Sequence, residues 1–168
     1  GLGYPGGYMI DQLAKVGDRE FHRFPRSHFK KGEYQFSFSG LKTSVAVYLR
    51  DKSDDFRSQY LNDICASFQE RVIDMLVTPS LNAALDHGID LVAVGGGVAA
   101  NSRLREAFVE RATQKGIRVL FPAFKYCTDN AAMIAVAGLA RLTAGEHAGL
   151  AIEARAQWPL ESLHVPCR

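Results

Sequence analysis

Two short stretches of the sequence combine residue types that could hold a ligand. The first, GGGVAAN at residues 95–101, directly follows an apolar run. Glycines at such a turn let a ligand lie against bare backbone, and the N–H groups at the start of a following helix attract anionic or polar ligand atoms. This chemistry suits a nucleotide. The glycines alone leave a second interpretation open, a tight connection packed under a neighbouring helix.

The first stretch matches no standard phosphate-binding motif. Its glycines are not spaced as G-x-G-x-x-G, and no Lys-Ser or Lys-Thr pair follows them as a Walker loop requires.

The second stretch is CTDN at residues 127–130. Asp129 stands where a helix would begin, so its carboxylate could cap that helix, which is the commoner role for such a residue. The same carboxylate could give one hard oxygen ligand to a metal ion whose other ligands come from elsewhere. The residue type alone leaves both roles open.

Strands and a helix must position these stretches. Apolar residues at 91–94 predict a buried strand, those at 117–121 predict a second strand, and helical spacing over 101–115 predicts a helix between them, capped by Asn101 or Ser102. A strand-helix-strand unit of this length implies parallel strands. Ligands at such sheets gather beyond the carboxyl ends of the strands, where both stretches fall.

The other expected elements are mostly helices. Apolar periodicity predicts them over residues 7–16, 39–49, 61–87 and 131–140. Ser39 is expected to cap the second of these and Pro79 to break or kink the third, while the fourth is expected to be buried. A short strand is expected over 34–38 and a polar connection over 51–58.

Length and composition describe one ordinary globular domain. The chain has 168 residues, 47% hydrophobic, and its formal charge of +2 is too small to indicate a nucleic-acid-binding protein by itself. It contains no apolar run of about 18 residues and no signal peptide, so we expect no membrane association. Cys65, Cys127 and Cys167 form no C-x-x-C pair and suit reduced thiols in the cytoplasm.

Four longer motifs follow one another along the chain. They are GLGYPGG at 1–7, FSFSGLKT at 36–43, GGVAAN at 96–101 and CTDNAAMIA at 127–135. Together they closely resemble the TsaD family, also called Gcp or YgjD. The tail RAQWPL at 155–160 is similar to the family's C-terminal end, so the resemblance spans nearly the whole chain.

The resemblance implies an α/β protein of the actin-like ATPase fold, the ribonuclease H-like architecture of sugar kinases and Hsp70, in which two lobes clasp a nucleotide. Residues 1–168 would form much of the second lobe, with parallel βαβ units and several helices. A helical insertion is expected over about 39–87 and the nucleotide-site core over about 88–142. The N-terminal lobe is expected to be absent.

For function, the resemblance implies an acyltransferase that moves a threonylcarbamoyl group from threonylcarbamoyl-AMP to the adenosine beside the anticodon of tRNA. By this resemblance, five residues match positions that contact the nucleotide, whether threonylcarbamoyl-AMP or ATP. They are Gly7, Asp11, Gly96, Gly97 and Asn101, with Asp11 directed toward the ribose. No residue is assigned as the catalytic base.

The resemblance also implies a divalent metal ion, iron or zinc, bound by Asp129 and by two histidines of an upstream His-x-x-x-His motif. No two of the five histidines stand four residues apart; they are His22, His28, His87, His147 and His164. We therefore interpret the chain as a C-terminal portion of such an enzyme and expect it to be inactive alone.

The implied partners are tRNA, an inactive TsaB-like paralogue and a TsaE-like ATPase. Three alternatives stay open: a non-catalytic nucleotide-binding or partner-binding module, a sugar-kinase-like phosphotransferase, and the glycoprotease named in older family descriptions. The protease is the weakest of them, because the sequence has no H-E-x-x-H helix and no nucleophile elbow.

A basic segment at residues 21–31 could contact tRNA. Its basic residues are Arg23, Arg26, Lys30, Lys31, His22 and His28, set among Phe21, Phe24 and Phe29. Such a segment could bind phosphates and stack on an unpaired base. The alternative is a solvated surface loop held by a few buried aromatic side chains.

Overall fold

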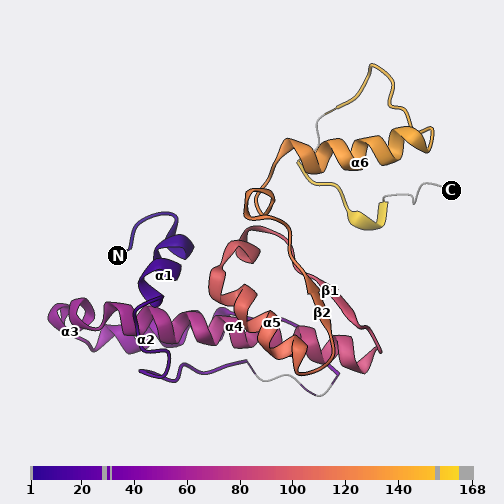
Figure 1. Cartoon of the computed structure of the whole chain (residues 1–168). Helices are drawn as coiled ribbons and strands as arrows, with labels where there is room; N and C mark the ends of the chain where they lie inside the picture. Colours follow the sequence, from indigo (N-terminus) through magenta and orange to yellow (C-terminus); the bar gives the residue numbers. More distant parts are fainter. Residues whose placement is uncertain (1, 28–29, 31, 154–155, 163–168) are drawn as a thin grey trace. The chain divides into compact units, whose positions relative to one another are not determined.

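The computed structural model describes residues 2–27, 30, 32–153 and 156–162, which divide into two compact units, 1–127 and 128–168 (Figure 1). The first unit is α/β, with helices and a small parallel sheet. Several residues named above lie outside the described residues: Gly1, His28, Phe29, Lys31, Arg155, His164 and Cys167.

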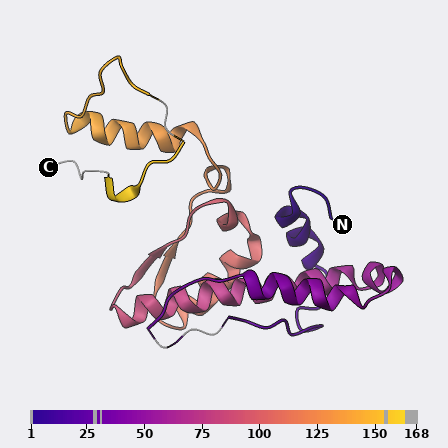
Figure 2. The same ribbon diagram turned by 180° about the vertical axis from the view of Figure 1, so that it is seen from behind.

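One long helix, α4 (Leu61–Asp86), is the scaffold of the first unit. Figures 1 and 2 show α1 (Gly6–Ala14) against one half of α4 and α5 (Ser102–Thr113) against the other. Of the break or kink expected at Pro79, the break does not occur, since α4 continues through this residue. Val77 and Leu81 on either side are fully buried, so packing offsets the hydrogen bond that a proline removes.

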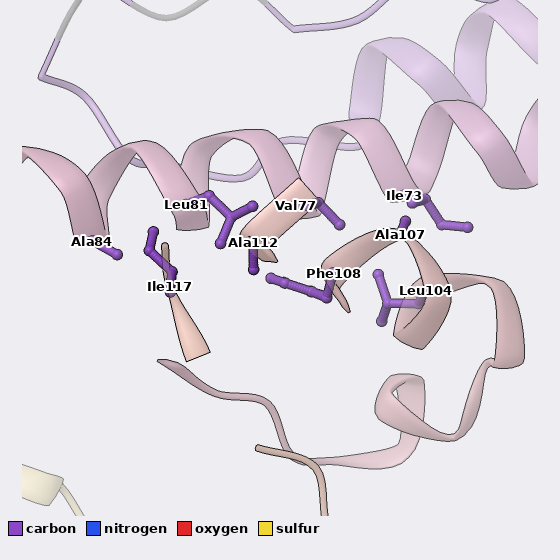
Figure 3. Close-up of a cluster of buried hydrophobic side chains, with 9 residues drawn as sticks. All are labelled: Ile73, Val77, Leu81, Ala84, Leu104, Ala107, Phe108, Ala112 and Ile117. Carbon is purple, nitrogen blue, oxygen red and sulfur yellow. The ribbon is translucent and has the colours of Figure 1, made fainter. Parts of the chain in front are cut away.

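The main core lies between α4 and α5. Figure 3 shows its nine buried side chains, which are Ile73, Val77, Leu81, Ala84, Leu104, Ala107, Phe108, Ala112 and Ile117. Ala107 is 0% exposed, and its small side chain lets the two helices approach closely. This packing fixes the start of α5, and with it the loop that precedes α5.

The expected strand-helix-strand unit is confirmed, but the expectation that its first strand is buried is wrong, since Leu91 and Ala93 are exposed and Val92 is half-buried. β1 (Leu91–Ala93) pairs in parallel with β2 (Arg118–Leu120), with Val92 opposite Val119, and α5 connects them. Both valines pack against the main core, while the alternate residues Leu91 and Leu120 are exposed.

A smaller core fastens α1 to α4. It contains Ala14, Cys65 and Ala66, with Ile10 and Leu13 packed against it. The helix expected over 7–16 is therefore present with slightly different bounds. Gly17 follows α1 at a point where a Cβ atom would collide with the backbone of Asn62, so only glycine lets the chain run this close to α4.

The segment between α1 and α4 differs from the expectation. Residues 34–38 form no strand, because they pair with no other strand among the described residues. Helix α2 (Ser39–Arg50) begins as expected, but its N-cap position is Phe38 and Ser39 does not cap it. The polar connection contains an additional short helix, α3 (Asp54–Gln59), capped by Ser53.

The second unit contains α6 (Ala131–Thr143) and a short 3-10 turn, η3 (Leu160–Ser162). The expectation that this helix is buried is wrong: Ile134 is 69% and Leu139 65% exposed. An apolar sequence predicts burial only where another element covers it, and the described residues of the second unit leave α6 without a buried residue. Within the described part of the chain, no helix has the length and apolar character needed to cross a membrane.

Candidate functional site

The glycine loop after β1 leads through the 3-10 turn η1 (Gly97–Ala100) to the start of α5. Gly96 has φ of +88°, which other residues rarely adopt, so this turn needs a glycine. Of the two capping residues that the sequence left open, Asn101 and Ser102, Asn101 is the N-cap of α5, because its Oδ1 accepts a hydrogen bond of 2.8 Å from the N–H of Leu104.

The amide nitrogen of Asn101 joins three distant parts of the chain. Its Nδ2 donates to Oδ1 of Asp11 on α1 at 3.0 Å and to Oε1 of Gln69 on α4 at 2.7 Å. Ser102 adds a hydroxyl donor to Asp11 at 3.2 Å. Asp11 and Gln69 are only 9% and 8% exposed, so burial makes these bonds costly to break.

This network lies at the edge of a cavity of about 390 Å³. Four of the five residues expected to contact a nucleotide line it, namely Gly7, Asp11, Gly97 and Asn101. The fifth, Gly96, is the residue next to Gly97 in the turn. The cavity therefore gathers residues that the sequence alone could relate only by motif.

The rest of the cavity wall is largely apolar. Its apolar side chains include Ile10, Phe68, Val72, Leu76 and Val98. A pocket of this size, with apolar walls and a few polar groups at one edge, is typical of a site for a small organic ligand. The apolar walls can hold a planar base, while the carboxylate of Asp11 can accept hydrogen bonds from ribose hydroxyls.

Sequence reasoning missed Gln69. The signal was available, because Gln69 is a polar residue within a helical stripe of core positions that includes Cys65, Phe68 and Val72. A polar side chain on a buried helix face must have a partner. The Oε1 of Gln69 fixes the orientation of the Asn101 amide, and its side chain lines the cavity, where Nε2 can serve as a donor.

One guanidinium connects the loops that follow β1 and β2. Arg105 on α5 donates to the carbonyl of Ala99 at 2.6 Å and to that of Pro122 at 2.8 Å. It also contacts Sγ of Cys127 at 3.1 Å and lies 4.0 Å from the ring centroid of Phe124 in the turn η2 (Phe124–Tyr126). Arg105 thus fixes the carbonyl of Ala99, whose neighbours Val98 and Ala100 line the cavity.

The loop that contains Asp129 is built differently. The helix cap expected of Asp129 belongs instead to Asn130, whose Oδ1 accepts from the N–H of Met133 at 3.0 Å. Asp129 is exposed and could give one oxygen ligand to a metal ion. Among the residues that the structure describes, no three histidines, cysteines or carboxylates come together as a metal site. These residues do not form a metal centre by themselves.

The basic segment has the aromatic anchors of the surface-loop alternative, and its contact with tRNA stays a prediction. Phe24 is 1% exposed and Phe21 stacks on Tyr60 at 5.0 Å, so both rings serve as anchors, and Phe24 cannot stack on a base. Arg23, Arg26 and Lys30 are exposed.

Comparison with known proteins finds one family, by a family model and by similar curated proteins. A family model described as TsaD, tRNA N6-adenosine threonylcarbamoyltransferase, matches residues 1–136. Curated proteins of that name are similar to the chain: one from Syntrophotalea carbinolica is 42% identical over 170 residues, and those from Geobacter metallireducens and Geobacter sulfurreducens are 45% and 47% identical over 165 and 163 residues. These matches cover 100%, 98% and 97% of the chain but 50%, 48% and 48% of the relatives.

Proposed function

We propose, from the premise that this chain belongs to the TsaD family, that it provides the adenylate-binding part of a tRNA N6-adenosine threonylcarbamoyltransferase. The chain spans about half the length of the curated relatives it matches. The whole enzyme would transfer threonylcarbamoyl from threonylcarbamoyl-AMP to the adenosine beside the anticodon of tRNA. We further propose that the parallel strands and helices belong to an actin-like ATPase lobe.

The observation that carries this proposal is the joint position of Asp11, Gln69 and Asn101 at one cavity. Both N–H groups of the Asn101 amide are already engaged, so this residue has no free donor for a ligand. We infer that Asn101 acts on the nucleotide mainly by holding the other two groups. Asp11 then accepts from the ribose hydroxyls, and Nε2 of Gln69 donates to a base nitrogen or a ribose oxygen.

The transfer itself needs a well-positioned donor. The exocyclic amine of adenosine attacks the carbamoyl carbonyl carbon, the bond from that carbon to the phosphate oxygen breaks, and AMP leaves while the amine loses a proton. The residues of this chain would bind and orient the adenylate, which lowers the barrier by restricting its freedom. We assign no base for the departing proton. We assign no step to a metal ion, because the described residues do not form a site for one.

The proposal is tested by complementation in two parts. The 168-residue chain is mixed with a polypeptide that covers the unmatched half of the Geobacter sulfurreducens relative, and both are incubated with tRNA and threonylcarbamoyl-AMP. Mass spectrometry of the digested tRNA then detects the modified adenosine. We expect modification by the mixture, no modification by the chain alone, and strong loss with Asn101→Asp in the mixture. Modification that persists with Asn101→Asp would contradict the assigned site.

The alternatives make different predictions. A nucleotide-binding module would bind AMP through the same cavity but support no transfer in the mixture. A sugar-kinase-like enzyme would consume ATP with a small hydroxylated substrate and need no tRNA. The names of the relatives give no support to a glycoprotease. The TsaB-like and TsaE-like partners, the metal ion and the cytoplasmic location stay predictions.

A further inference from the structure

A second hollow in the first unit has a different character. It has a volume of about 490 Å³, lies between the segment 19–26 and helices α4 and α5, and shares no lining residue with the cavity described above. Five arginines line it: Arg19, Arg23, Arg26, Arg71 and Arg111. We call it the arginine groove.

Carboxylates balance only part of this charge. The groove contains Glu20, Glu70 and Asp74 against its five arginines. His22 also lines it, but burial, helped by the charge of Lys52, lowers the pKa of this imidazole below its ordinary value, so it stays neutral near pH 7. The groove alone thus has an excess of two positive charges, the same net charge as the whole chain.

Three of the five arginines share one carboxylate, that of Asp74. Asp74 lies within ion-pair distance of three guanidinium groups, at 3.0 Å from Arg111, 3.3 Å from Arg71 and 3.7 Å from Arg26. Within the described chain, the buried Nε of Arg71 has no hydrogen-bond partner. The 3.7 Å separation is longer than a hydrogen bond, and Arg26 is 53% exposed, so its guanidinium is free to turn toward an incoming anion.

The outer arginines are freer still. Arg19 and Arg23 are exposed, and no ion pair within the described residues involves either of them. They line the groove on the same segment as Arg26. Guanidinium groups are well suited to this arrangement because their planar donors bind phosphate oxygens in pairs.

We propose that the arginine groove binds the sugar-phosphate backbone of tRNA. This inference rests on the proposed function, which makes tRNA the substrate. An open groove with an excess of guanidinium groups fits a chain of phosphates. The aromatic side chains beside it are engaged within the fold, since Phe24 is buried and His22 stacks on Tyr48 at 4.0 Å. The groove therefore contributes affinity and orientation and does not read the bases.

The experiment is a tRNA-binding titration of the double variant Arg19→Glu/Arg23→Glu over a range of salt concentrations. Both side chains are exposed, so the fold should survive, and an unchanged circular dichroism melt verifies this. The matched control is Arg50→Glu/Lys115→Glu, which makes the same charge change at two exposed positions outside the groove. We expect affinity for purified tRNA at about 0.1 M salt to fall at least tenfold in the groove variant and less than threefold in the control. The slope of log affinity against log salt should become shallower by roughly one unit for each phosphate that the variant no longer neutralises.

Further measurements separate the possible failures. AMP binding should be unchanged in the groove variant, because the cavity is not altered. The proposed role of the groove would be overturned if the groove variant and the control lost equal tRNA affinity. It would also be overturned if the wild type bound poly-glutamate more tightly than tRNA. Neither result would contradict the proposed function. Loss of tRNA binding specific to the groove variant would support the groove even if no threonylcarbamoyl transfer were found, in which case the proposed function alone would fail. A neutral pair, Arg19→Gln/Arg23→Gln, should show about half of the effect on log affinity.

Discussion

The loops that follow β1 and β2 look alike in sequence and differ in structure. Each ends at an asparagine whose Oδ1 caps the next helix, Asn101 for α5 and Asn130 for α6. Among the described residues, the Nδ2 of Asn130 bonds only locally, to the carbonyl of Thr128, whereas that of Asn101 bonds to side chains from two other helices. Both asparagines cap a helix through their side-chain oxygen, so the difference between the loops lies in the amide nitrogen. The amide of Asn101 also bonds to residues on two distant helices, and this links the capping residue to the candidate site.

The largest expected effect comes from removing each asparagine side chain in turn. Asn130→Ala loses a cap and should cost its own unit about 1 kcal/mol. Asn101→Ala loses a cap, removes one of the two donors to Asp11 and leaves the buried Oε1 of Gln69 without its donor, so we expect a loss of about 3 kcal/mol. Amide hydrogen exchange under increasing urea concentration reports the free energy of opening for α5 and for α6 separately. Comparison of each variant with the wild type then gives the loss in each unit. Equal losses would show that the long-range bonds of Asn101 add no stability.

A smaller effect is expected from Gln69→Leu, which keeps the bulk of the side chain but removes both of its polar groups. The Asn101 amide then loses one acceptor, and the cavity loses the Nε2 donor. We expect AMP affinity to fall about tenfold, in keeping with the loss of one hydrogen bond in a buried site. Calorimetric titration gives this value. Gln114→Leu, at an exposed position, is the control and should bind AMP normally.

Arg105→Lys should have a weaker effect on the same loop. Lysine keeps the charge but cannot bond to the carbonyls of Ala99 and Pro122 with a planar fork. We expect AMP affinity to fall by a factor of about three, together with faster amide hydrogen exchange in residues 96–101. Unchanged exchange would mean that the loop holds its position without Arg105. Lys125→Arg serves as a control, because it keeps the charge at a position outside this contact.

The smallest expected effect is on the pH dependence of stability. It involves a residue of neither loop, so it shows how much stability changes when both loops are left intact. His22 has a pKa below its ordinary value of 6.5, chiefly because of burial. The unfolded chain therefore binds a proton more readily, and the stability contributed by this group declines as pH falls from about 6.5 toward the lower folded pKa. In His22→Phe, which retains a ring against Tyr48, we expect stability to depend less on pH in that window. An identical pH profile would assign the dependence to other groups.

Local patterns predicted much of the fold. The parallel pair, the helix between its strands, and the Asn101 cap all follow from periodicity and capping chemistry, which depend on neighbours in the sequence. The errors arose where the outcome depends on distant residues. Among the described residues, 34–38 have no partner strand. Helix α4 continues through Pro79 because its flanks are buried, and α6 has no cover within its own unit.

In the candidate site too, local motifs predicted some residues, while a residue that depends on distant packing was missed. Motifs identified Gly7, Asp11, Gly97 and Asn101, and the structure brings these four to one cavity. Gln69 belongs to no such motif and was missed, since only the packing of α4 against the Asn101 loop reveals its partner. The cap assigned to Asp129 was off by one residue, because neighbouring Asp and Asn side chains suit the same position.

The proposed adenylate site is tested most directly by calorimetric titration of AMP into the wild-type chain and into two matched variants, Asn101→Asp and Asn130→Asp. Each variant keeps an oxygen that can cap its helix and removes the amide donors. Only Asn101→Asp also places a second carboxylate beside Asp11. We predict that AMP binds the wild type and Asn130→Asp equally and binds Asn101→Asp at least about tenfold more weakly. Equal affinity in all three proteins would contradict the claim that the long-range bonds of Asn101 form the adenylate site.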